Sequence, residues 1–165
     1  MKRDFRQTFP SERSYMKKLR IYVDTSVVGG CFDKEFFEDS IALFDMARKG
    51  KIILLVSDLL IAELDNAPDR VLQLFKTLSD DVVERIDISE DALNLRDKYI
   101  KDKVLGHASE NDALHVAIAS VHNADMIVSW NFKHIVHYDK IKGFNAVNIR
   151  EGYGAIAIYS PKEVV

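Results

Sequence analysis

Short runs of apolar residues, separated by segments with helical periodicity, constrain the fold of this chain more than any other feature. The runs at 21–23, 52–56 and 126–128 consist of aliphatic residues, one tyrosine and one methionine. Strands this apolar are typical of parallel sheets buried on both faces, whereas strands in antiparallel sheets usually alternate apolar and polar residues. With helices between them, these runs predict an α/β fold with right-handed crossovers.

The remaining segments predict further strands and five helices. A loosely alternating segment over 82–88 and the runs 146–149 and 155–159 indicate strands. Helical spacing of apolar residues predicts helices over 35–49, 58–66, 69–78, 90–103 and 110–123. Ser57 and Ser89 are expected to cap two of these helices, and Gly29-Gly30 is expected to break the chain after the first strand.

Composition places the chain among single-domain globular proteins. Its 165 residues are the length of one domain, and its only cysteine, Cys31, excludes an internal disulfide. A lone cysteine favours a reducing, cytoplasmic location, and no apolar run approaches the length of a membrane helix. We expect residues 1–18 to form a poorly ordered basic extension and residues 19–165 to form a single domain.

The charge is unevenly distributed along the chain. Residues 1–20 hold seven basic and two acidic side chains, although the whole chain has a net charge of −3. The rest of the chain is therefore strongly acidic, which excludes a large non-specific nucleic-acid-binding surface. A phosphate-bearing partner would have to be bound through a metal ion, the basic segment or a local patch.

Acidic side chains follow the predicted strands at their carboxyl ends, where open α/β sheets bind ligands. Asp24 comes directly after the first strand, Glu63 interrupts an apolar helix, and Asp112 lies near the start of the last predicted helix. Taken singly, each has an ordinary explanation as a turn, solvated or helix-dipole residue. If they converge, their repulsion requires a cation, and oxygen ligands favour Mg²⁺ or Mn²⁺.

Four segments resemble, in order and spacing, the signature blocks of the PIN-domain family. They are Ile21–Ser26, Ser57–Glu63, Asn111–Ala119 and Ala124–Phe132. The resemblance implies a three-layer α/β/α fold with a central parallel sheet of strand order 3-2-1-4-5. It also implies a Mg²⁺- or Mn²⁺-dependent endoribonuclease that hydrolyses RNA phosphodiester bonds. Many members of the family are VapC-type toxins of toxin–antitoxin pairs.

The resemblance also assigns roles to residues of this chain. It places the metal ligands at Asp24, Glu63 and Asp112, and these three with Asn131 would carry the catalysis. The family usually has an aspartate where Asn131 stands, so a second metal ion would bind more weakly here. Four hydroxyl side chains are expected to orient the ligands or their waters, namely Thr25, Ser26, Ser57 and Ser129. The implied partners are the RNA substrate, a cognate antitoxin and a second copy of the chain.

Three alternatives remain open at this point. The uncharged Asn131 and the acidic body favour a non-catalytic PIN-like module that binds RNA or a protein through a degenerate metal site. The five histidines lack a zinc-binding pattern, so surface or core roles are expected for them. Trp130, Phe132 and Tyr138 would either pack against the sheet edge or stack on an RNA base.

Overall fold

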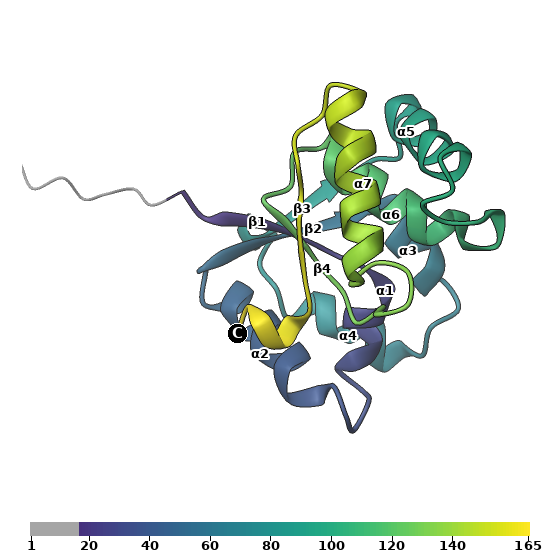
Figure 1. Ribbon diagram of the computed structural model, residues 1–165. Coiled ribbons are helices and arrows are strands. Elements are labelled where there is room, and N and C mark those ends of the chain that lie inside the picture. The colour runs from purple at the N-terminus through teal and green to yellow at the C-terminus, as the bar shows by residue number, and fades with distance from the viewer. Residues whose placement is uncertain (1–16) are drawn as a thin grey trace, which may run out of the picture.

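The computed structural model describes residues 17–165, in which five strands form one parallel sheet of order β3-β2-β1-β4-β5 (Figure 1). The strands are β1 (Leu19–Val23), β2 (Ile52–Ser57), β3 (Val83–Ile86), β4 (Met126–Val128) and β5 (Ala157–Tyr159). The predicted α/β class and strand order are confirmed. The predicted basic extension over 1–18 lies almost entirely outside the described residues.

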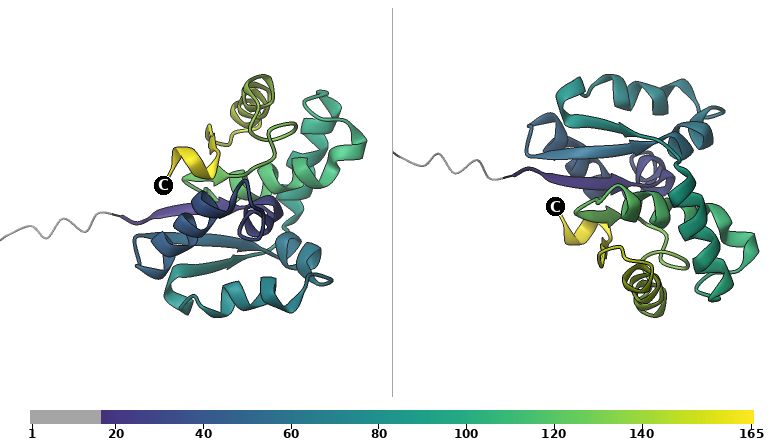
Figure 2. Two further views of the ribbon diagram at one scale, coloured as in Figure 1. Left: turned by 90° about the horizontal axis from the view of Figure 1, so that it is seen from below. Right: turned by 90° about the horizontal axis from the view of Figure 1, so that it is seen from above.

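Helices cover both faces of this sheet (Figure 2). They are α1 (Thr25–Gly30), α2 (Phe37–Arg48), α3 (Asp58–Leu64), α4 (Asp69–Lys76), α5 (Glu90–Lys101), α6 (Glu110–Val121) and α7 (Tyr138–Arg150). Short 3-10 turns occur at Asp80–Val82, His107–Ser109 and Pro161–Glu163. None of the helices in residues 17–165 is long and apolar enough to cross a membrane.

Strand β1 lies at the centre of the sheet and contributes to two apolar cores. Ile21 and Val23 pack with residues of α1, α2 and α4, whereas Tyr22 packs with residues of α5, α6 and α7. All three side chains are fully buried. Burial of a large apolar side chain contributes about 1.5–3 kcal/mol, so both helical layers help to fix the position of β1. The residues that follow β1 are therefore held on a rigid element.

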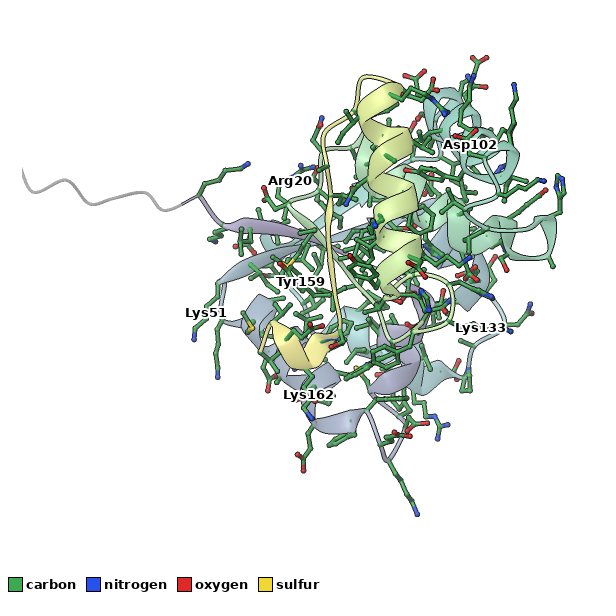
Figure 3. All side chains as sticks on the ribbon, in the orientation of Figure 1. Arg20, Lys51, Asp102, Lys133, Tyr159 and Lys162 are labelled. Atoms are coloured by element: carbon green, nitrogen blue, oxygen red, sulfur yellow. The ribbon has the colours of Figure 1, made fainter. Side chains whose placement is uncertain are left out.

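An ion pair ties β1 to β3 and to the turn before β4. Arg20, labelled in Figure 3, donates from Nε to Oε2 of Glu84 at 2.9 Å and from Nη2 to Oε1 at 2.6 Å. Its Nη1 donates to the carbonyl oxygens of His122 and Asn123 at 3.1 and 2.9 Å. Paired bonds of this kind hold a guanidinium and a carboxylate in one geometry.

Two predictions of local structure were wrong. The segment 146–149 belongs to α7 and not to a strand, because Val147 packs in the core while the buried Asn148 binds Tyr99 and Ser120. Gly29 and Gly30 lie inside α1 and do not break the chain. The glycine at position 30 is needed for packing, since a Cβ there would lie 2.4 Å from Oγ of Ser40.

Candidate active site

Asp24 lies at the carboxyl end of β1, where it caps α1, and its side chain is almost fully buried. Oδ1 accepts a hydrogen bond from Oγ of Ser26 and Oδ2 accepts one from Oγ of Ser129, both at 2.6 Å. Burial raises the pKa of Asp24, and the nearby His115 and the two serines offset only part of this effect. Within residues 17–165, no lysine or arginine forms an ion pair with this buried carboxylate.

Glu63 projects from α3, a helix that begins where the Ser57 hydroxyl accepts a hydrogen bond from the Leu60 N–H. Its Oε2 accepts a hydrogen bond from the hydroxyl of Thr25, the residue next to Asp24, and lies 3.0 Å from Nε2 of His115. Burial opposes ionisation of Glu63, but the hydrogen bond and charge of His115 and the Thr25 bond outweigh it, so the pKa is lowered. Glu63 is therefore a carboxylate at neutral pH.

Asp112 lies in the first turn of α6 and is linked to Asp24 by a chain of hydrogen bonds. Its Oδ2 is 2.7 Å from Nδ1 of His134, on the loop between β4 and α7. The backbone N–H of His134 donates to Oδ1 of Asn131 at 2.9 Å, and the Asn131 N–H donates to Oγ of Ser129 at 2.9 Å. Ser129 in turn donates to Asp24, which completes the chain. Asp24, Ser26, Ser129, Asn131 and Asp112 thus belong to one hydrogen-bonded cluster, whereas Glu63 is bonded only to Thr25 and His115.

Ser57 does not contact the carboxylates directly. Its hydroxyl lies 2.9 Å from the hydroxyl of Tyr22, which lies 2.6 Å from Nδ1 of His115. Tyr22 and His115 are both buried, and sequence reasoning assigned neither of them to the site. The one available signal was the spacing of His115 three residues after Asp112, which places both on the same side of a helix. His134 was missed as well, because nothing in its local sequence indicates a carboxylate partner.

The oxygen donors of this cluster fit a hard divalent cation by their chemistry. Thr25 and His115 both contact Oε2 of Glu63, so neither contacts its Oε1. Likewise, His134 contacts Oδ2 of Asp112 and not its Oδ1. A bound cation would also offset the free-energy cost of a buried negative charge on Asp24. However, residues 17–165 contain no group of three or more His, Cys, Asp or Glu side chains arranged to hold a metal ion.

Trp130 connects the site to the neighbouring helices. Its backbone N–H donates to Oγ of Ser26 at 2.8 Å, its Nε1 donates to Oγ of Ser40 at 2.8 Å, and its ring stacks on Phe36 with centroids 4.3 Å apart. Trp130 therefore packs against the protein. Phe132 and Tyr138, by contrast, are 49% and 74% exposed.

Residues 20–133 of this chain match a family model described as PIN domain. Among solved structures, one similar chain comes from VapBC2 of Rickettsia felis bound to a promoter DNA fragment. It is 16% identical to this chain, and the match has a TM-score of 0.54 and covers 86% of this chain and 98% of that chain.

Two further solved structures are similar to the same extent. A chain of DNA-bound VapBC from Salmonella typhimurium is 16% identical, with 87% of this chain and 98% of that chain covered and a TM-score of 0.54. For FitAcB from Neisseria gonorrhoeae the identity is 16%, the coverages are 86% and 98%, and the TM-score is 0.52. No curated protein matches the chain. At these identities the solved structures establish a shared fold.

Proposed function

Because this chain belongs to the PIN-domain family, we propose that it is a divalent-metal-dependent endoribonuclease that hydrolyses RNA phosphodiester bonds. The observation that carries the proposal is the buried Asp24 carboxylate, which has no lysine or arginine partner in residues 17–165 and is hydrogen-bonded into one cluster with Asp112. Glu63 accepts a hydrogen bond from Thr25, the residue that follows Asp24 in the sequence. The choice of RNA over DNA rests on the family resemblance.

In the proposed reaction, Asp24 and Asp112 would hold the ion, and Glu63 would complete the site or orient a water. When bound, Mg²⁺ or Mn²⁺ would polarise the scissile phosphate and lower the pKa of a water for in-line attack. Ser26 and Ser129 hold the Asp24 carboxylate in place. The Oδ1 atom of Asn131 already accepts the His134 N–H, so its Nδ2 is the atom that would orient a phosphate oxygen.

The proposal is tested by incubating the full chain with end-labelled mixed-sequence RNA and either Mg²⁺, Mn²⁺ or EDTA. We expect cleavage with the metals, none with EDTA, and loss of cleavage in Asp24→Asn and Asp112→Asn. Asp139→Asn is the matched control, because Asp139 also lies in the first turn of a helix but outside the cluster. Cleavage that survives in both site variants would contradict the proposal.

The second candidate function is a non-catalytic module that binds RNA or a protein partner. It is favoured by the uncharged Asn131 and by the absence of a three-residue metal group in residues 17–165. Intact RNA at micromolar protein in every metal, together with a mobility shift of that RNA, would favour this module over the nuclease.

We also propose that the chain is a cytoplasmic toxin that forms a homodimer and pairs with an antitoxin. The similar Rickettsia and Salmonella structures are of VapBC2 and VapBC, which motivates this part of the proposal. An inhibitory partner would present arginine or lysine to the acidic cluster, because opposite charges favour the correct pairing. Co-purification with the product of a neighbouring gene, and the mass of the complex in solution, test this part separately.

A further inference from the structure

A chain of four polar side chains runs through the centre of the protein and ends at Glu63. Ser57 at the end of β2 lies 2.9 Å from the hydroxyl of Tyr22 on β1, and that hydroxyl lies 2.6 Å from Nδ1 of His115 on α6. Nε2 of His115 lies 3.0 Å from Oε2 of Glu63 on α3. Ser57 and Tyr22 are 0% exposed and His115 is 2% exposed. These hydrogen-bonded side chains therefore connect four separate elements.

If the His115 ring is neutral, the contacts allow one direction for these hydrogen bonds. Because the Glu63 carboxylate can only accept, the hydrogen must be on Nε2 of His115. In a neutral ring Nδ1 is then an acceptor, so the Tyr22 hydroxyl must donate to it. Tyr22 has then used its one proton, and Ser57 must donate to the Tyr22 oxygen. This agrees with the remaining contact of Ser57, whose Oγ accepts the Leu60 N–H at 3.1 Å.

Electrostatics support the carboxylate form from which this direction follows. Burial opposes the charge on Glu63, but the hydrogen bonds from His115 and Thr25 favour it, and the pKa of Glu63 is lowered. Burial raises the pKa of the Tyr22 hydroxyl, so Tyr22 keeps its proton and remains a donor. Among the described residues, no buried side-chain nitrogen or oxygen lacks a hydrogen-bond partner.

We propose that Tyr22 and His115 are positioning residues that hold Glu63 in one orientation for the reaction. This inference rests on the proposed nuclease function. Two donors, His115 and Thr25, bind Oε2 of Glu63, so neither of them occupies Oε1. The side chain of a partly buried glutamate can adopt several rotamers, and a hydrogen bond to a ring nitrogen in a fixed position favours one of them. The buried Tyr22 and His115 side chains thus restrict the orientation of Glu63.

If Tyr22 has only a structural role, the outcome expected for matched variants is different. Tyr99 is a suitable control because, like Tyr22, it is fully buried and its hydroxyl is hydrogen-bonded. That hydroxyl binds Asn148 and lies 3.4 Å from Oγ of Ser120, and neither residue belongs to the site. Tyr22→Phe and Tyr99→Phe each remove one buried hydroxyl. If Tyr22 only stabilises the fold, the two variants will lower the thermal midpoint and leave the turnover of folded protein unchanged.

The first experiment measures RNA cleavage and thermal stability of the full-length variants. We expect His115→Leu and Tyr22→Phe to lower kcat by roughly 10- to 100-fold, as is typical for residues that orient a metal ligand, and Tyr99→Phe to leave kcat unchanged. His115→Gln should recover part of kcat because its amide places an N–H donor near the position of Nε2. His115→Asn offers a donor only near Nδ1 and should not recover it.

The second experiment does not depend on cleavage. Nitrogen-15 NMR of the imidazole in metal-free protein should show a hydrogen on Nε2 of His115, and Tyr22→Phe should weaken this preference. An Nε2 atom without a hydrogen would overturn the inference. So would variants at Tyr22 and His115 that cleave as fast as an active wild type. If the wild type itself cleaves no RNA, the proposed function fails first and this inference fails with it.

Discussion

Replacement of Gly30 by alanine should disrupt the packing of Trp130 beside the candidate site. A Cβ at this position would lie 2.4 Å from Oγ of Ser40 and 2.8 Å from Nε1 of Trp130. These two atoms are themselves hydrogen-bonded at 2.8 Å, and the Trp130 ring is stacked on Phe36. The added methyl group therefore cannot be accommodated unless at least one of these contacts is lost.

The magnitude follows from the contacts that must give way. Overpacking of a well-filled interior costs about 1–3 kcal/mol, and loss of the Trp130–Ser40 hydrogen bond adds about 0.5–1.5 kcal/mol. The better helix propensity of alanine offsets at most about 1 kcal/mol. We therefore expect Gly30→Ala to lower the free energy of unfolding by about 0.5–4.5 kcal/mol.

The adjacent glycine provides a matched control. A Cβ at Gly29 would meet no atom within 4 Å, and this residue lies in the same helix. Gly29→Ala should therefore raise the free energy of unfolding by about 0.5–1 kcal/mol through helix propensity alone. Because the gain in helix propensity is common to both, the two variants should differ by about 1.5–4.5 kcal/mol although they carry the same substitution one residue apart.

Urea unfolding followed by tryptophan fluorescence measures this difference directly, because Trp130 is the only tryptophan in the chain. The midpoint should fall for Gly30→Ala and rise for Gly29→Ala, and the native emission of Gly30→Ala should shift. Equal midpoints for the two variants, with unchanged native emission, would refute the packing described for Trp130.

Three further predictions concern charge and metal binding. Glu84→Gln should be less stable than the wild type at pH 7. Because the Arg20 hydrogen bond lowers the pKa of Glu84, this difference in stability should vanish as the pH falls from the usual carboxyl range through the lowered pKa. Unfolding at several pH values measures it. Asn131→Asp should reduce the metal concentration needed for half-maximal cleavage, because it adds a charge while retaining an acceptor for the His134 N–H. Mn²⁺ should raise the melting temperature of the wild type, with about 2.7 kcal/mol of stabilisation at 100 times the Kd, and this effect should be absent in Asp24→Asn.

The sheet was predictable from the sequence because its inner strands are buried on both faces. Residues 21–23 and 52–56 are apolar throughout for that reason, and they lie at the centre of the sheet. The segment 146–149 looked similar but lies in α7, where the buried Asn148 forms hydrogen bonds with Tyr99 and Ser120. A short apolar run cannot by itself distinguish a strand from a buried helix.

The candidate site was predictable only in part. Asp24 and Asp112 could be named because the carboxyl ends of parallel strands and nearby helix starts meet at one edge of the sheet. The histidine partner of Asp112 could not, because His134 is 22 residues from Asp112 in the sequence and only the folded chain brings the two together. Tyr22 was missed for a related reason: a tyrosine inside a strand reads as an ordinary β-former, and its hydrogen bond to His115 is a tertiary contact.

Diffraction from a crystal soaked in Mn²⁺ and measured at the manganese absorption edge tests the central claim most directly. We expect an anomalous peak within coordination distance of carboxylate oxygens of Asp24 and Asp112, with Glu63 Oε1 turned toward it. An anomalous map without a peak at these carboxylates, with Asp24 still bound only by Ser26 and Ser129 and Asp112 by His134, would contradict the claim that this cluster is a metal site.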